Sequence, residues 1–484
     1  MQVDVIPSDS DAQADLRVLA LADGEELSAP LSEVAGAADV RTAASKATVL
    51  RPSAGERVLV VGLGSSDELG AEGLRVAAAV AAKQAQRFDA TSIAWDLPAA
   101  ERLQTAEAAA AIVEGTILTG YRFDRFRGRD QDDPAPMDID RIALLTDDDA
   151  EATEAAARVA LVAAEAANRA RELQNLPANV ANPTYLADRA REIAATHSSV
   201  EVDVLGREQM AELGMGGMVA VSKGTVEEPC LIVLRHRGSD SGERLGLVGK
   251  AVTFDTGGIS IKPSAKMEEM KMDMSGGAAV LEAVSAIAEL DVAIDLVAVI
   301  PSTENMPSGT ATRPGDIITQ LNGKTVEVNN TDAEGRLILA DALTYCVREL
   351  GADRVVDLAT LTGAILVALG STYAGLVSND DAWAAEVAEA AESTGELAWR
   401  LPLHQEYKEL TKGSVADLTN ASAKRKAGSI YAASFLEEFV DAKPWVHLDI
   451  AGTAWDVGRE YVGNGATGFG VRLLVALARD LAGS

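Results

Sequence analysis

The sequence predicts an α/β protein of two domains, in which a smaller N-terminal α/β domain precedes a larger C-terminal domain with a mostly parallel central sheet flanked by helices. Short apolar runs alternate with alanine-rich stretches over residues 1–150. A long segment without glycine or proline follows at residues 151–173, and from Pro183 onward apolar runs alternate with helical stretches again. Such alternation is typical of parallel sheets whose strands are joined by helices.

In the N-terminal domain, residues 57–61 and 141–145 predict strands, and residues 71–86 predict a helix. Gly62 and Gly64 follow the first strand in the manner of a dinucleotide fingerprint, but the third glycine position is Asp67, whose carboxylate would face a pyrophosphate. We therefore favour a glycine turn after a strand. Nucleotide binding by this domain is the alternative, which a nucleotide titration would test.

Residues 151–174 predict one connecting helix because they are rich in alanine, glutamate and arginine. A turn cluster at residues 175–179 ends this helix, so the second domain is predicted to span residues 175–484. Its strand candidates are residues 202–205, 231–235, 245–248, 294–300, 355–359 and 446–450.

One uncharged segment, residues 358–379, is long enough to span a bilayer. Glycine and hydroxyl residues interrupt it, which favours a buried strand, a turn, a short apolar helix and another strand. We therefore expect no membrane-spanning segment.

The composition excludes several classes of protein. Of the 484 residues, 48% are hydrophobic, which is enough for a large core and excludes disorder as a global description. The formal charge of −31 disfavours binding to nucleic acids or anionic membranes, because both carry negative charge. Outside the region of the candidate metal site, the densest basic cluster comprises Arg122, Arg125, Arg127 and Arg129. We expect these arginines to pair with Asp124, Asp130, Asp132 and Asp133 on a solvated loop; a nucleic-acid patch is the alternative.

The cysteines and the first residues indicate a cytoplasmic protein. Cys230 and Cys346 lie in apolar surroundings, as expected of buried thiols in a reducing compartment. Residues 1–15 are acidic and lack the cationic and apolar regions of a signal peptide.

Candidate catalytic residues lie on short loops that follow predicted strands. Lys250 and Asp255 come after the strand at residues 245–248, at the end of an open α/β sheet where ligands bind. Asp273 precedes an alanine-rich helix, and taken alone it is an ordinary acid at a helix N-terminus. Asp332 and Glu334 follow the extended run of residues 324–328 and precede a helix at residues 337–343. Taken alone, they are a solvated pair.

If these four carboxylates converge, their charges are untenable in a dry pocket without cations. Two divalent ions would balance four negative charges. The four histidines are too widely spaced for a histidine-based zinc helix, so the ligands would be mainly oxygen atoms. A neutral Lys250 amine can complete the coordination shell, while Lys262 and Arg336 are left to hold anionic oxygen. Two-metal sites activate water against carbonyl or phosphoryl groups.

The run NNTDAEGRL at residues 329–337 resembles the signature of the leucine aminopeptidase family, which comprises cytosolic peptidases with two zinc or manganese ions. Further segments resemble the family, namely residues 248–258, 271–276, 357–364, 447–455 and 465–468. The resemblance extends from about Asn175 to the C-terminus and is faint over the first 150 residues. It implies metal-dependent release of N-terminal amino acids from peptides.

The resemblance also implies the ligands of the two metals. Asp255 and Glu334 would bridge the ions. Lys250 and Asp273 would complete the tighter site, and Asp332 would complete the more exchangeable one. The free α-amine of the substrate would bind a metal and the Asp273 carboxylate, so that the enzyme would be an exopeptidase.

Two positive side chains have roles implied by the same resemblance. Lys262 would polarise the scissile carbonyl and hold the tetrahedral oxyanion. Arg336 would hold a bicarbonate ion that serves as the general base towards the attacking water, with Ala333, Gly335 and Leu361 as the other residues of the bicarbonate site.

The substrate pocket implied by the resemblance contains Met270, Asn330, Thr360, Leu361, Gly363 and Ala451. Ala454 occupies a position that is larger in some relatives, so we expect a roomy pocket that takes leucine, methionine or an aromatic residue. The family forms homohexamers, which we carry over as an expectation. Some relatives bind DNA, and a mobility shift on plain duplex DNA would test that alternative, which the charge of −31 disfavours.

Overall fold

The computed structural model describes residues 1–53, 55–98, 103–128, 138–239, 242–422, 424 and 426–483. The chain divides into two compact units, Met1–Glu165 with Gly458–Gly463 and Ala166–Val457 with Asn464–Ser484. This division falls inside the predicted connecting helix, which is α3 (Ala150–Asn175). The domain limits drawn from the sequence, at residues 150 and 175, stay a prediction. The expected acid partners Asp130, Asp132 and Asp133, like Arg129, lie outside the described residues; Arg122 forms an ion pair with Asp138.

The first unit contains a six-stranded sheet in the order β1-β6-β5-β2-β4-β3. Neighbouring strands are parallel, except that β3 is antiparallel to β4. Helix α1 (Ala71–Arg87) packs against β4 and β2, and α2 (Thr105–Gly120) packs against α1. The strands are β1 (Gln2–Ile6), β2 (Leu16–Ala22), β3 (Ala47–Leu50), β4 (Val58–Gly64), β5 (Ser92–Asp96) and β6 (Arg141–Leu145). The predicted strands and helix of this unit are confirmed.

The glycines at the end of β4 serve the packing of a neighbouring loop. A Cβ atom at Gly62 would lie 2.3 Å from the carbonyl oxygen of Ala43, and Gly64 has a φ of +77°. Glycine is the residue that tolerates both conditions. Backbone therefore fills the space beside these glycines, which supports the glycine turn over the nucleotide fingerprint.

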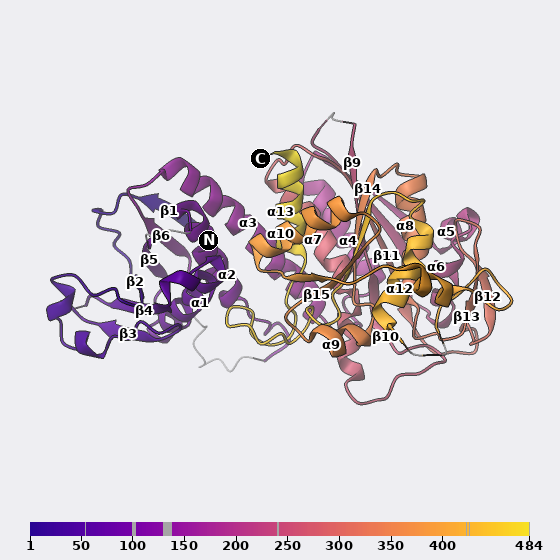
Figure 1. Ribbon diagram of the computed structural model, residues 1–484, viewed down its shortest axis with the longest axis horizontal. Helices are drawn as coiled ribbons and strands as arrows, with labels where there is room; N and C mark the ends of the chain where they lie inside the picture. The colour runs from indigo at the N-terminus through magenta and orange to yellow at the C-terminus, as the bar shows by residue number, and fades with distance from the viewer. Residues whose placement is uncertain are drawn as a thin grey trace. The chain divides into compact units, whose positions relative to one another are not determined.

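The second unit is built on a nine-stranded sheet in the order β16-β15-β18-β14-β9-β11-β8-β7, with β10 also paired to β11. Strands β9, β10, β11, β14 and β15 of this sheet are labelled in Figure 1. Five of its strand pairs are parallel and three are antiparallel, which confirms the mostly parallel sheet. The strands are β7 (Val200–Gly206), β8 (Cys230–Arg237), β9 (Arg244–Gly249), β10 (Ala251–Asp255), β11 (Asp295–Asn305), β14 (Arg354–Ala359), β15 (Ala374–Ser378), β16 (Ala398–Arg400) and β18 (Trp445–Asp449).

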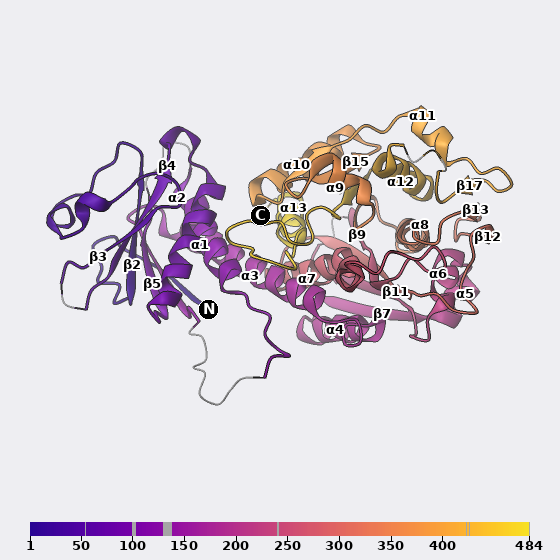
Figure 2. The same cartoon turned by 90° about the horizontal axis from the view of Figure 1, so that it is seen from below.

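Helices cover both faces of this sheet (Figure 2). Helices α4, α7, α10 and α13 pack together on one face, and α8 lies with α6 and α12 on the other. The helices are α4 (Pro183–Thr196), α5 (Arg207–Leu213), α6 (Gly216–Val221), α7 (Ser275–Glu289), α8 (Gly335–Arg348), α9 (Gly363–Leu369), α10 (Asp381–Thr394), α11 (Gln405–Lys408), α12 (Gly428–Leu436) and α13 (Val471–Ala482). A small sheet contains β12 (Asp316–Thr319), β13 (Thr325–Val328) and β17 (Leu418–Thr419).

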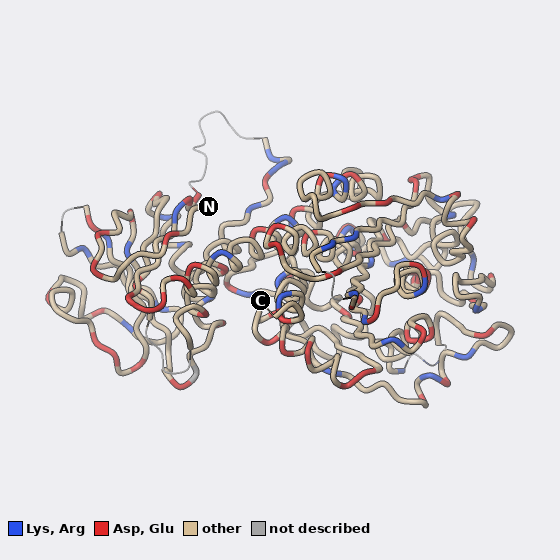
Figure 3. Tube along the Cα trace, turned by 90° about the horizontal axis from the view of Figure 1, so that it is seen from above, with Lys and Arg blue, Asp and Glu red and all other residues tan. Residues whose placement is uncertain are grey.

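Residues 358–379 fold as the sequence predicted, with the end of β14, a turn, α9 and β15 in succession. Among the residues that the structure describes, no helix has both the length and the apolar character needed to cross a membrane. Cys230 and Cys346 are buried free thiols, as expected. Acidic and basic residues are interspersed along the chain in each unit (Figure 3).

A break between two strands positions the site. Strands β9 and β10 are consecutive in the chain and both pair in parallel with the long strand β11, so that Lys250 is the single residue between them. Its backbone N–H donates to the Leu358 carbonyl at 3.0 Å, and its carbonyl accepts from Gly277 at 2.7 Å. The Lys250 backbone is thereby held between β14 and α7.

Candidate active site

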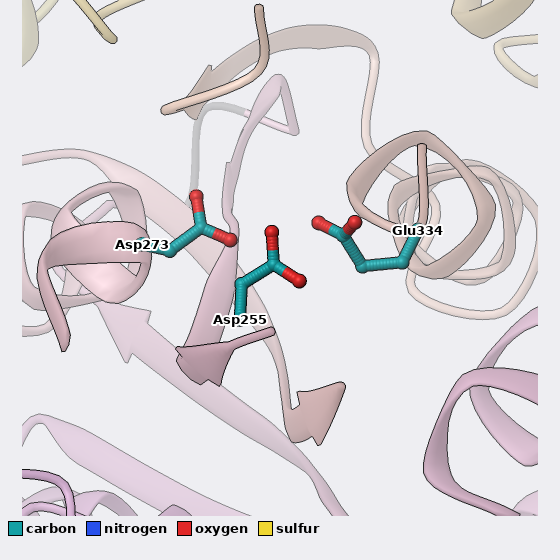
Figure 4. Close-up of side chains that lie close together, drawn as sticks. All are labelled: Asp255, Asp273 and Glu334. Atoms are coloured by element: carbon teal, nitrogen blue, oxygen red, sulfur yellow. The ribbon is translucent and has the colours of Figure 1, made fainter. Parts of the chain in front are cut away.

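Three carboxylates that are distant in the sequence meet in the second unit. Asp255 ends β10, Asp273 lies just before α7, and Glu334 immediately precedes α8. All three are buried, and they offer oxygen atoms that lie within 4.8 Å of one another (Figure 4). In this view the Asp255 carboxylate stands between the other two. The predicted convergence of these acids is therefore present.

Lys250 lies inside this cluster. Its Nζ atom is 2.8 Å from Asp273 Oδ2 and 2.8 Å from Glu334 Oε1, and it donates to the Thr360 carbonyl at 3.1 Å. Burial alone would lower the pKa of Lys250, but the attraction of Asp273 and Glu334 outweighs burial and raises it. In the absence of metal, the ammonium group thus serves as the counterion of the two acids.

Lys262 holds the other side of the cluster. Its Nζ atom is 2.7 Å from Asp255 Oδ2 and forms an ion pair with Asp332. Asp332 is the more accessible of the acids, with a side chain that is 32% exposed. The nearby acids raise the pKa of Lys262 against the opposing effect of burial.

The protonation of the acids shows how crowded their charges are. Burial raises the pKa of Asp273 to about 8 and that of Asp255 to about 6, with repulsion from Glu334 adding to both shifts. Burial also acts to raise the pKa of Glu334, but Lys250 and Lys262 reverse the shift and lower it. Two ammonium groups therefore do not neutralise the four carboxylates fully.

The donor set fits divalent cations. Within the described residues, the buried atoms Asp273 Oδ2 and Asp332 Oδ1 have no partner with hydrogen-bond geometry, and they form ion pairs with Lys250 and Lys262. Buried carboxylate oxygens of this kind bind hard or borderline cations such as Mg²⁺, Mn²⁺ and Zn²⁺.

Asn305 belongs to the cluster, although the sequence analysis missed it. Its Nδ2 donates to Asp255 Oδ1 at 2.8 Å and to the Thr331 carbonyl at 3.0 Å, and it lies 3.4 Å from Glu334 Oε2. Such contacts orient ligating carboxylates. One feature of the sequence could have indicated Asn305: it is a polar residue a few positions after the predicted strand at residues 294–300. In open α/β sheets, ligand-binding residues lie at the carboxyl ends of the strands.

The cluster lines a cavity of about 650 Å³. The cavity wall includes every residue predicted for the substrate and bicarbonate sites, namely Met270, Asn330, Ala333, Gly335, Arg336, Thr360, Leu361, Gly363 and Ala451. Thr360 also donates through Oγ1 to Asp273 Oδ1 at 2.7 Å, a contact that the sequence did not indicate. Ala454 is fully buried and is not among the lining residues, so the structure does not support its predicted place in the pocket.

Arg336 is a buried cation in the cavity wall. Its Nη1 donates to the Asn420 carbonyl at 2.8 Å, and its guanidinium carbon lies 5.5 Å from the centre of the Tyr431 ring. The buried Nε atom has no hydrogen-bond partner among the described residues. Burial lowers the pKa of Arg336 from its ordinary value. The side chain thus keeps donor capacity for an anion.

Known proteins resemble this chain along almost its whole length. Residues 168–475 match the sequence model of the cytosol aminopeptidase family, catalytic domain, and residues 7–130 match that of the N-terminal domain of the same family. The "probable cytosol aminopeptidase" of Roseiflexus castenholzii is 45% identical over 99% of both chains. The protein of the same description from Solibacter usitatus is 47% identical over 93% of this chain and 91% of that protein.

Solved structures agree with the fold. The bottromycin maturation enzyme BotP in complex with Mn is 36% identical, with a TM-score of 0.88 over 97% of this chain and 100% of that chain. A mutant of tomato leucine aminopeptidase is 35% identical, with a TM-score of 0.88 over 99% of this chain and 96% of that chain. The two-domain α/β fold, the buried carboxylate cluster and these matches place the chain among metal-dependent hydrolases. The chain belongs to the cytosol aminopeptidase family.

Proposed function

We propose that this protein uses two divalent ions to release N-terminal amino acids from peptides with a free N-terminus, with leucine and other apolar residues preferred. The observation that carries the proposal is the meeting of three buried carboxylates, Asp255, Asp273 and Glu334, around the buried Lys250 in the wall of a cavity. Isolated acids on a protein surface bind metals weakly, whereas a buried cluster requires compensating positive charge.

The proposed metal ligands are the residues implied by the family resemblance. Asp255 and Glu334 would bridge two ions, Lys250 and Asp273 would complete one site, and Asp332 would complete the other. The greater exposure of Asp332 supports a more exchangeable ion beside it. Bound ions would supply Lewis acidity that lowers the pKa of a water and polarises a carbonyl. Zinc and manganese both suit this ligand set, and one similar solved structure, that of the bottromycin maturation enzyme BotP, is in complex with Mn.

Side chains of this protein would orient the substrate and stabilise developing charge. The Lys262 ammonium would hold the oxygen of the scissile carbonyl, where negative charge grows during the reaction. The free α-amine of the substrate would bind a metal and the Asp273 carboxylate. Recognition of that group would restrict cleavage to the first peptide bond.

Arg336 would hold bicarbonate as the expected base. The neighbouring lining residues Ala333, Gly335 and Leu361 would complete the anion site. The buried Nε atom without a hydrogen-bond partner among the described residues supports this assignment.

The pocket for the first side chain would be formed by Met270, Asn330, Thr360, Leu361, Gly363 and Ala451. Small residues at positions 363 and 451 leave space in the lining for a large apolar side chain. Turnover of glycyl substrates equal to that of leucyl substrates would contradict this preference.

We also propose that the protein is cytoplasmic and forms a homohexamer. The proposed domain limits are those drawn from the sequence, with an N-terminal domain at residues 1–150, a connecting helix at residues 151–174 and a catalytic domain at residues 175–484. The names of the relatives support the compartment, and the family resemblance supports the assembly. Sedimentation of the purified protein at six times the mass of one chain would support the hexamer, and a monomeric mass would contradict it.

One experiment tests the proposed chemistry directly. The protein is stripped of metal with a chelator, reloaded with Mn²⁺ or Zn²⁺, and assayed for hydrolysis of leucyl-amide. Activity should vanish on chelation and return with either ion. N-acetylated leucyl-amide and an Asp332→Ala variant are the controls, and neither should give normal turnover. Activity that survives chelation, or that ignores the acetyl group, would contradict the mechanism.

A further inference from the structure

A buried carboxylate that is not itself part of the cavity lining contacts two separate segments of that lining. Asp449 is the last residue of β18 and is 1% exposed. Its Oδ1 accepts from the backbone N–H groups of Leu361 at 3.1 Å, Thr362 at 3.3 Å and Ala451 at 3.3 Å. Its Oδ2 accepts from the Thr362 hydroxyl at 2.6 Å.

These donors come from the segments that would contact the first side chain of a substrate. Leu361 and Thr362 lie in the turn between β14 and α9, and Ala451 follows β18. All three residues line the cavity, whereas Asp449 does not. The Thr362 hydroxyl also lies 2.7 Å from Ser429 Oγ, on the first turn of α12. One carboxylate therefore joins two segments of the cavity lining and, through Thr362, helix α12.

The strand that carries Asp449 is itself anchored by buried polar contacts. Trp445, His447 and Asp449 alternate along β18, so their side chains share one face of the strand. Trp445 Nε1 donates to Asp357 Oδ2 at 2.7 Å, and His447 Nδ1 lies 2.7 Å from Asp357 Oδ1. All four side chains are buried. Strand β18, which carries Asp449, is thus fixed to Asp357 of β14 by two side-chain contacts.

We propose that Asp449 is a positioning residue that sets the width of the pocket for the first side chain, and thereby the discrimination between large and small N-terminal residues. The proposal rests on the proposed aminopeptidase function. Its physical basis is that four hydrogen bonds to one carboxylate tie separate backbone segments together, so that neither segment moves without breaking them. Without the hydrogen bonds accepted by Asp449, the turn at residues 361–362 and the segment at Ala451 would move independently.

The test is the Asp449→Asn variant of the full-length protein reloaded with Mn²⁺. An amide keeps the shape of the side chain but turns one of its acceptor atoms into a donor, so at least one of the contacts is lost. We measure kcat and KM for leucyl-amide and glycyl-amide. A pocket that fits a leucyl side chain should favour leucyl-amide over glycyl-amide at least about 100-fold in kcat/KM, because the two substrates differ by several carbon atoms. We expect Asp449→Asn to reduce this leucyl-to-glycyl ratio at least about tenfold.

Asp341→Asn is the matched control. Asp341 is also fully buried and accepts backbone N–H donors, from Leu321 at 2.8 Å and Met218 at 3.0 Å, but it does not line the cavity. This control should lower Tm without changing the leucyl-to-glycyl ratio. Metal content by mass spectrometry and Tm are recorded for each variant, so that unfolding and metal loss are recognised.

A second pair of variants keeps the proposal testable if Asp449→Asn does not fold. Thr362→Val removes the hydroxyl contact with Asp449, and Thr362→Ser retains it. The proposal expects the valine variant to lose discrimination and the serine variant to preserve it. An unchanged leucyl-to-glycyl ratio in Asp449→Asn or in Thr362→Val, with both substrates slowed equally, would overturn the proposal. Failure of the unaltered protein to hydrolyse leucyl-amide would instead overturn the proposed function.

Discussion

The Lys250 ammonium lies 2.8 Å from the carboxylate of Glu334, and a glycine makes this approach possible. Gly335, the residue after Glu334, begins α8, and a Cβ atom there would lie 2.6 Å from both Nζ and Cε of Lys250. The lysine is buried and fixed at its tip by ion pairs, so it has little room to yield.

Gly335→Ala should therefore displace Lys250 and weaken metal binding. We expect at least about a tenfold loss of metal affinity, as for other changes that disturb the orientation of ligands, with a parallel loss of leucyl-amide hydrolysis. Metal titration by calorimetry measures the first effect. Gly309→Ala is the matched control, because a Cβ atom at Gly309 would meet nothing within 4 Å. Normal metal affinity in Gly335→Ala would contradict the assignment of Lys250 as a ligand.

Lys262→Met should lower kcat by about 10²–10³-fold, the usual cost of losing one donor to a developing oxyanion. KM for leucyl-amide should change much less, because the lost interaction strengthens only as charge develops. Steady-state kinetics separate the two constants. Lys266→Met is the control, since Lys266 lines the same cavity but is 75% exposed and paired with Glu269. A large rise in KM with normal kcat would show that Lys262 binds substrate only.

The metal-free protein should lose stability as pH rises through the window set by Asp273. In the folded protein its pKa is raised to about 8 from 3.8, so the folded state binds this proton more tightly than the unfolded state does. The favourable contribution of the protonated Asp273 side chain to the free energy of unfolding is complete below about pH 4 and is lost progressively up to about pH 8. Asp273→Asn lacks this proton linkage. The Tm of the variant minus that of the unaltered protein should therefore increase from pH 5 to pH 8 in chelator. A constant difference would contradict the shift.

Ala451→Leu should narrow the pocket for the first side chain. Because an added isobutyl group competes for the space of a leucyl substrate, we expect at least about a tenfold loss of kcat/KM for leucyl-amide and little change for glycyl-amide. Ala265→Leu adds the same volume at an exposed position of the cavity wall and serves as the control. Equal losses for both substrates would remove Ala451 from the specificity pocket.

Much of the local structure was predictable, because hydrophobic periodicity and helix propensity are local properties. The strand at residues 245–248 and the helix at residues 337–343 appear as β9 and α8, and the long helix appears as α3. The prediction of a strand at residues 294–300 stopped short of the end of β11, which continues to Asn305. Residues 302–305 are polar and carry no strand pattern; they are extended because they pair with β10.

The extension of β11 to Asn305 explains why the sequence did not indicate Asn305. It also explains why Asp255 lies beside this residue. Register between β10 and β11 places Asp255 opposite Asn305, and no local signal encodes such a pairing. The burial of Ala454 and the hydrogen bonds to Asp449 could not be predicted from the sequence either, since both depend on which segments pack against the end of β18.

The sequence by itself determined which side chains carry charge and metal-binding oxygen, their order along the chain and the elements that bear them. The tertiary structure decided which of them meet. The reason is physical: strand order and register bring together the ends of β10 and β11 and the start of α8 from distant parts of the chain, and only in that arrangement do buried carboxylates lie close enough to one another to require compensating positive charge.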